Sequence, residues 1–261
     1  MEELEEKNIE EVVKEETIEE PSIIQPSLDT SLSQTKSKKQ KFLDAFLGRW
    51  RYYTKTQIIA INALLCAIVI LFVIAPINFG TLDVAVIPII AVLISVEVMG
   101  LLNGMLTGLF FGLCSLINQL IRPGIFALFI IQNPLVTFFP RIMIAVMAFL
   151  VMKLFDLIFS KIKYKTDTAK KITPKILDTI KYAIASAIGV ITNTSGFLGF
   201  IYLFYFGSNL SNGKVIDGTY IWAIVASNAL VEILVCTLVT PAIVLAVSKT
   251  LEITMRKKTK A

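Results

Sequence analysis

Six apolar stretches, separated by loops whose positive charge alternates between the two sides, set the pattern of this chain. They run over Thr56–Ala75, Asp83–Val98, Asn103–Ile121, Phe139–Phe159, Ile180–Phe206 and Tyr220–Val247. Crossing a hydrocarbon core takes about 20 helical residues, and most of the stretches are that long. The second has only 16 residues and contains Pro88, so we expect it to be kinked or partly re-entrant. The pattern predicts an all-α integral membrane protein, built as a bundle of six transmembrane helices.

Composition supports this class and sets the domain boundaries. Of 261 residues, 55% are hydrophobic and 17% are charged, whereas a soluble domain carries about 25% charged residues. We expect a membrane domain over residues 41–248 and a basic C-terminal tail over 249–261. Residues 1–20 contain ten Glu. Residues 1–40 bury too little apolar surface to fold, so we expect a disordered acidic and polar N-terminal tail.

Positive charge near the helix ends orients the bundle. Lys and Arg cluster before the first stretch, between the fourth and fifth, and after the sixth, while the opposite loops hold only Arg122, Arg141 and Lys214. With six crossings, all three basic segments lie on one side of the membrane. The positive-inside rule then places both termini in the cytoplasm and the chain in the cell membrane. The basic segment Lys36–Lys41 is expected near anionic lipid headgroups, and nothing in it indicates nucleic acid.

The side chains that most enzymes need are missing from this sequence. The chain has no His, and Cys66, Cys114 and Cys236 each stand alone in a different apolar stretch. No Walker A, HExxH or GxSxG motif occurs. We therefore expect no enzymatic activity, no metal site and no cofactor. Active transport by this chain would have to take its energy from a partner or an ion gradient.

Polar residues inside the stretches are the candidates for a binding site, because ionisable groups in a membrane usually face a cavity or a partner. By topology they lie at mid-depth or in the outer half, where they can converge on one outward-facing pocket. Arg141, following Pro140, is expected to open the fourth helix. The alternatives are interhelical hydrogen bonds and a structural Arg–Glu ion pair. The candidate residues are Asn118, Arg141, Asn193, Thr194, Asn228 and Glu232.

Other features have narrower interpretations. The outside loop 122–138 is either a lid over a cavity or a loop that packs on the bundle. Small residues at Ala60, Ala63 and Ala67 let another helix approach the first one closely, whereas Gly104, Gly108 and Gly112 are expected to pack inside the bundle. Charged side chains at inner helix ends are interpreted as interfacial or snorkelling; these are Glu97, Lys153, Asp156 and Lys181.

Several short motifs, taken in order, resemble the substrate-binding S component of an energy-coupling factor (ECF) vitamin transporter. The resemblance covers residues from about 55 to 247. It is carried by Ala63-Leu-Leu-Cys-Ala67, Ile87-Pro88-Ile89-Ile90, Gly100-Leu-Leu-Asn-Gly104, Gly108-Leu-Phe-Phe-Gly112, Phe139-Pro140-Arg141, Thr192-Asn193-Thr194 and Asn228-Ala-Leu-Val-Glu232.

The resemblance implies a subunit that binds a vitamin from outside and has no ATP site of its own. A T component and two ATPases would be its partners, and the T component would dock on Ala60, Ala63 and Ala67. The motifs look most like the pantothenate branch, in which Arg141 would pair with the vitamin carboxylate. Cobalamin, folate and riboflavin are the alternative ligands. A self-sufficient transporter that uses Glu232 for proton coupling, and a membrane regulator whose acidic tail recruits a soluble partner, are the alternatives in function.

Overall fold

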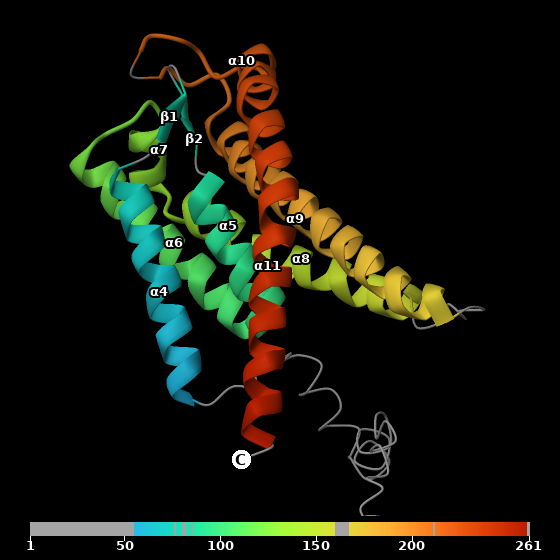
Figure 1. The fold of residues 1–261 in the computed structure, drawn as a ribbon. Helices are drawn as coiled ribbons and strands as arrows, with labels where there is room; N and C mark the ends of the chain where they lie inside the picture. The colour runs from blue at the N-terminus through green and yellow to red at the C-terminus, as the bar shows by residue number, and fades with distance from the viewer. Residues whose placement is uncertain are drawn as a thin grey trace, which may run out of the picture. The chain divides into compact units, whose positions relative to one another are not determined.

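Helices make up most of this chain, with one short hairpin among them (Figure 1). The computed structural model describes residues 55–75, 77–79, 82–84, 86–159, 167–210 and 212–259, all within one compact unit over 44–261. The predicted tail over 1–40 lies outside the described residues. The elements are α4 (Lys55–Ile74), β1 (Ile77–Phe79), β2 (Leu82–Val84), α5 (Val86–Ile94), the π-helix η2 (Ser95–Met99), α6 (Leu101–Ile121), α7 (Ala127–Gln132), α8 (Leu135–Phe159), α9 (Asp167–Tyr205), α10 (Gly218–Ile224), the π-helix η3 (Val225–Ala229) and α11 (Leu230–Thr259).

Five of the described helices are long and apolar enough to cross a membrane. They lie over Thr56–Ile74, Leu101–Ile121, Leu135–Phe159, Ile176–Tyr205 and Leu230–Thr250. This confirms the predicted class, a helical protein of the membrane. The sixth predicted crossing corresponds to the shorter apolar helix Val86–Met99. The predicted all-α fold also missed an antiparallel hairpin, in which Ile77 pairs with Val84 before α5 begins.

The short second helix is the centre of the bundle. Almost every residue of α5 and η2 is buried, and α5 contacts α4, α6, α8, α9 and α11. A helix that is apolar all round suits a position enclosed by other helices. Pro88 lies in the first turn of α5, where a helix needs no backbone N–H, so this proline does not interrupt the helix. The departure from α-helical geometry is instead η2, over Ser95–Met99.

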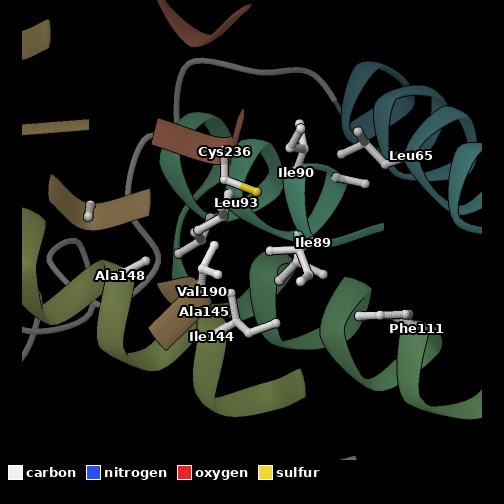
Figure 2. Close-up of a cluster of buried hydrophobic side chains, with 14 of the residues drawn as sticks. Leu65, Ile89, Ile90, Leu93, Phe111, Ile144, Ala145, Ala148, Val190 and Cys236 are labelled. Atoms are coloured by element: carbon white, nitrogen blue, oxygen red, sulfur yellow. The ribbon is translucent and has the colours of Figure 1, made fainter. Parts of the chain in front are cut away.

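A large apolar core joins these helices (Figure 2). Ile89 and Leu93 of α5 are fully buried and lie among side chains from several neighbouring helices. Figure 2 shows Leu65, Phe111, Ile144, Val190 and Cys236 converging on this helix from α4, α6, α8, α9 and α11. Cys236 is buried with its thiol free, as expected for a small apolar side chain in a core.

Glycines let α6 pack closely against η2 and α8. A Cβ at Gly104 would lie 2.5 Å from the Cβ of Val96, and one at Gly108 would lie 2.5 Å from the carbonyl oxygen of Arg141. A Cβ at Gly112 would lie 2.9 Å from a ring carbon of Phe138. The prediction that these glycines pack inside the bundle is therefore confirmed.

Two predicted helix boundaries were wrong. The fourth helix begins at Leu135 rather than Phe139, so Pro140 and Arg141 lie inside α8 instead of opening it. The backbone of α9 is already helical from Asp167, well before the predicted start at Ile180. The residues added to α9 are mostly polar, whereas those added to α8 are mostly apolar and precede Pro140, so neither hydropathy nor the proline marked the true start of the helix.

Candidate functional site

The guanidinium group of the half-buried Arg141 lies over two aromatic rings of neighbouring helices. Its central carbon is 5.4 Å from the ring centroid of Phe111 on α6 and 5.1 Å from that of Phe197 on α9. Its Nη1 donates to the carbonyl oxygen of Val136 at 3.5 Å, while its buried Nε has no hydrogen-bond partner among the described residues. A cation held over two ring faces is stabilised without using its N–H donors. Arg141 can therefore donate to an anion.

Two further predicted residues meet on the facing helices. Thr194 of α9 donates from Oγ1 to the Glu232 carboxylate of α11 at 3.3 Å. Glu232 is buried, and it lies close enough to Arg141 for the two charges to interact. The arrangement thus links α8, α9 and α11 through a cation, a carboxylate and a hydroxyl. It has the polar groups to bind a ligand that combines a carboxylate with hydroxyl or amide groups.

Buried polar atoms without partners mark the same region. Asn193 precedes Thr194 on α9, is 7% exposed, and its Oδ1 accepts no hydrogen bond from any described residue. Phe197 lies one helical turn further on the same face. The hydroxyl of Thr137, one turn before Arg141 on α8, is also buried with no partner within the described part of the chain. Such atoms cost free energy unless a ligand or water satisfies them.

Sequence reasoning did not select Thr137, Phe111 or Phe197. A signal for Thr137 was available, because it lies four residues before Arg141 and therefore on the same helix face. The two phenylalanines carried no such signal. Each lies in an apolar stretch rich in similar residues, and their contact with Arg141 depends on how α6 and α9 pack against α8.

A small aromatic cluster covers this site from the side of α7 and α10. Its buried members are Phe129, Val136, Ile201, Leu210 and Ile216, and the aromatic residues packed against them are Phe126, Phe197, Phe200, Tyr205 and Tyr220. Phe126 packs edge-to-face on Phe197 with 5.7 Å between ring centroids, and the Tyr205 hydroxyl donates to the carbonyl oxygen of Phe129 at 3.3 Å. The loop 122–138 is thus held on α9 by side-chain contacts, and the Phe126 ring contacts a residue that itself stacks on Arg141.

Two predicted site residues are not placed in this group. Asn118 lies near the end of α6, seven residues beyond the Phe111 whose ring lies against the Arg141 guanidinium, which corresponds to about 10 Å along a helix. Its carbonyl oxygen accepts the backbone N–H of Arg122 at 2.7 Å, as part of the helix end. Asn228 belongs to the backbone of η3, and its side chain lies outside the described part of the structure.

A second polar cluster lies at the other end of α8 and α9. The prediction that its charged side chains are interfacial or snorkelling was wrong for Glu97 and Lys181, which are buried. Glu97 is 5% exposed and Lys181 is 7% exposed. Lys181 pairs with Asp156 and with Asp178, each at 3.0 Å, and the Glu97 carboxylate accepts a hydrogen bond from Ser186 at 3.2 Å. Hydropathy could not reveal this burial, because it results from α9 covering the end of η2.

The sequence model of one known family matches most of the membrane domain. This family is the ECF transporter, substrate-specific component, and the match covers residues 57–244. The chain belongs to this family. It is therefore the S subunit of an ECF transporter, a membrane transport protein rather than an enzyme. No curated protein matches the chain in sequence.

The first helix of this S component presents an apolar surface with small residues along it. Ala60, Ala63 and Ala67 of α4 are all exposed, and Leu64 and Leu71 beside them are 62% and 59% exposed. The opposite face of α4 packs on the bundle through Leu65, Val69 and Val73. In addition, the side-chain amide of Asn62 donates to the Asn103 side chain of α6 at 3.0 Å. The three alanines thus line an outer surface of a firmly attached helix.

Proposed function

We propose that this S component captures pantothenate from the outer side of the membrane. The observation that carries the proposal is Arg141, whose guanidinium lies over the rings of Phe111 and Phe197 with a buried Nε that lacks a partner in the described structure. A guanidinium binds a carboxylate through two parallel hydrogen bonds, and pantothenate carries one carboxylate. Its two hydroxyls and its amide need neutral partners of the kind that Thr137, Asn193 and Thr194 offer.

Glu232 has a separate role in this proposal. A buried carboxylate repels an anionic ligand unless it is matched by a cation or a donor. Glu232 accepts from Thr194 and interacts with the charge of Arg141, so it orients these two groups and accepts a ligand hydroxyl rather than facing the ligand carboxylate. Asn118 and Asn228 remain candidates for the more distant part of the ligand.

The proposed topology has six crossings with both termini in the cytoplasm. The basic segments before α4, between α8 and α9, and after α11 support it through the positive-inside rule. In this orientation the hairpin, α7 and α10 face outside, so that the aromatic cluster closes the site on the side from which the vitamin arrives.

For uptake, we propose that α4 docks on a T component that acts with two ATPases. ECF substrate-specific components work with these partners, and the exposed alanines of α4 allow close helix packing. The chain has no Walker A motif of its own. Energy from ATP would therefore reach the vitamin site only through the docked T component.

The ligand is tested by calorimetry on the purified chain in detergent. Pantothenate should bind far more tightly than cobalamin, folate or riboflavin. Its alcohol analogue, in which a hydroxymethyl group replaces the carboxylate, should bind at least tenfold more weakly, since a charge-assisted hydrogen bond contributes about 1.5–3 kcal/mol. Equal affinity for pantothenate and the alcohol would contradict the role of Arg141. Tight binding of another vitamin would replace the assignment.

Docking is tested by replacing small residues on the exposed face of α4 with larger apolar ones, which block close helix packing but remain compatible with lipid. Ala63→Leu combined with Ala67→Leu should abolish vitamin uptake by cells that contain the whole transporter, with binding by the isolated chain unchanged. Ala242 and Ala246 of α11 are also exposed and also four residues apart, so the double leucine variant at those positions is the matched control. Equal uptake by the two double variants would exclude α4 as the docking helix.

A further inference from the structure

A glycine of α9 packs on the proline that precedes Arg141. A Cβ placed at Gly196 would lie 3.2 Å from the Cβ and 3.3 Å from the Cγ of Pro140, and 3.6 Å from its Cα. The proline ring is rigid and adjoins the backbone, so it cannot turn aside to make room. This proline–glycine contact, between Pro140 and Gly196, brings the backbones of α8 and α9 close together because residue 196 has no side chain.

The two helices run antiparallel, and other contacts fix their register. Further from the proline–glycine contact, Gly189 of α9 lies against Ile144 of α8, where an added Cβ would be 3.3 Å from the Cγ2 of the isoleucine. Further still, Lys181 of α9 pairs with Asp156 of α8 at 3.0 Å. Residue numbers thus rise along α8 as they fall along α9, and each level of one helix faces a defined level of the other.

Gly196 shares a face of α9 with two residues of the proposed vitamin site. Asn193 lies three residues before Gly196 and four before Phe197, which is the spacing of neighbours on one side of a helix. The centroid of the Phe197 ring is 5.1 Å from the guanidinium carbon of Arg141. Asn193 is 7% exposed, and its Oδ1 has no hydrogen-bond partner in the described part of the chain. A shift of α9 at Gly196 would therefore move both groups relative to α8.

The same spacing occurs on α8. Thr137 lies three residues before Pro140 and four before Arg141, and its hydroxyl is buried with no partner among the described residues. Because the helices are antiparallel, Thr137 and Asn193 lie on opposite sides of the proline–glycine contact, each about 4.5 Å from it along the helix axis. Two buried polar atoms that need partners, one on each helix, are thus held at a separation that this contact sets.

We infer that Gly196 is a positioning residue of the vitamin site, which touches Pro140 rather than the ligand and sets the separation of α8 and α9. The inference rests on the proposed binding of a vitamin at Arg141. Without a side chain at residue 196, Asn193 and Phe197 stay at the distance from Arg141 that one ligand can span. A methyl group there would push the helices apart by a few tenths of an ångström, which would weaken hydrogen bonds from both helices to the same ligand.

Two alanine variants of the full chain in detergent separate positioning from packing. Gly196→Ala should bind pantothenate about 5- to 10-fold more weakly by calorimetry, as expected when one hydrogen bond to the ligand is lost. Its thermal unfolding midpoint should stay nearly unchanged, because the gain in helix propensity offsets the small strain.

Gly189→Ala is the matched control, since Gly189 lies on the same helix about 10 Å from Gly196. An added Cβ there would lie 2.8 Å from the Cδ2 of Leu93 in the apolar core. This variant should lower the unfolding midpoint by several degrees, through overpacking, and leave the affinity for pantothenate unchanged.

The outcomes separate this inference from the proposed function. Equal affinity of Gly196→Ala and the wild type would overturn the inference, and so would an equal loss of affinity in both glycine variants, since general packing would then explain it. If the wild type binds cobalamin, folate or riboflavin instead of pantothenate, the pantothenate assignment fails, and the same comparison with that vitamin decides the inference. If the wild type binds none of the four, both fail.

A second comparison applies if Gly196→Ala does not fold. Pro140→Ala removes the Cγ that the new Cβ would meet at 3.3 Å but keeps the Cβ at 3.2 Å. The double variant Gly196→Ala with Pro140→Ala is compared with Pro140→Ala alone, so that the backbone N–H gained at residue 140 is present in both. Weaker binding by the double variant supports the inference, and equal binding overturns it.

Discussion

Arg141 donates from Nη1 to the carbonyl oxygen of Val136 at 3.5 Å, across one turn of α8. In a regular helix this carbonyl accepts the backbone N–H of residue 140, but residue 140 is a proline and has none. The proline therefore leaves an acceptor that the guanidinium can reach. Because the distance is at the long end for a hydrogen bond, this contact is weak: it orients the Arg141 side chain but is easily exchanged for another acceptor. The guanidinium stays available to a stronger acceptor such as a carboxylate.

Arg141→Lys should lower pantothenate affinity by about 10- to 100-fold. Lysine keeps the positive charge but loses the planar fork that binds a carboxylate through two hydrogen bonds and stacks on aromatic rings. The loss corresponds to about 1.5–3 kcal/mol. Isothermal calorimetry on the isolated chain measures it. Arg122→Lys is the control, since Arg122 donates to the carbonyl oxygen of Ile74 and lies at the end of α6, eleven residues or about 16 Å along the helix from Phe111. Equal pantothenate affinities for the two variants would show that Arg141 does not bind the carboxylate.

Gly108→Ala should lower the free energy of unfolding by about 1–3 kcal/mol, the usual cost of overpacking an interior. The added Cβ would lie 2.5 Å from the Arg141 carbonyl oxygen, so α6 and α8 would have to separate. Gly199→Ala is the matched control, because nothing lies within 4 Å of a Cβ there. That variant should be neutral or up to about 1 kcal/mol more stable. Thermal or denaturant unfolding in detergent separates the two, and equal stability would refute the close packing.

Hydropathy was enough to find the helices, and their polar residues were enough to select part of the site. Arg141, Thr194 and Glu232 could be named from the sequence because charged and polar groups are rare in such stretches. Phe111 could not, because nothing in an apolar sequence distinguishes a phenylalanine that stacks on a guanidinium from one that packs in a core. Hydropathy also misjudged Glu97, whose burial depends on coverage by α9 rather than on its position along the chain.

The hydrogen bond between Thr194 and Glu232 should couple α9 to α11. A double-mutant cycle with Thr194→Val and Glu232→Gln, read by unfolding in the absence of vitamin, should give a coupling free energy of about 0.5–1.5 kcal/mol. The range follows from one hydrogen bond to a buried acceptor at 3.3 Å. Additive effects of the two substitutions would show that the contact contributes nothing to stability. In that case Glu232 would be held by its other neighbours.

Tyr205→Phe should speed vitamin dissociation while leaving the fold intact. The Tyr205 hydroxyl donates to the carbonyl oxygen of Phe129 and so helps to hold α7 on α9, over the proposed site. Losing one such bond costs about 1 kcal/mol, which corresponds to a dissociation rate about fivefold higher if the loop must lift for release. Stopped-flow displacement measures the rate. Tyr202→Phe is the control, because Tyr202 is 46% exposed and packs on Phe206 instead. Identical dissociation rates in the two variants would mean that the vitamin leaves by a route that does not move α7.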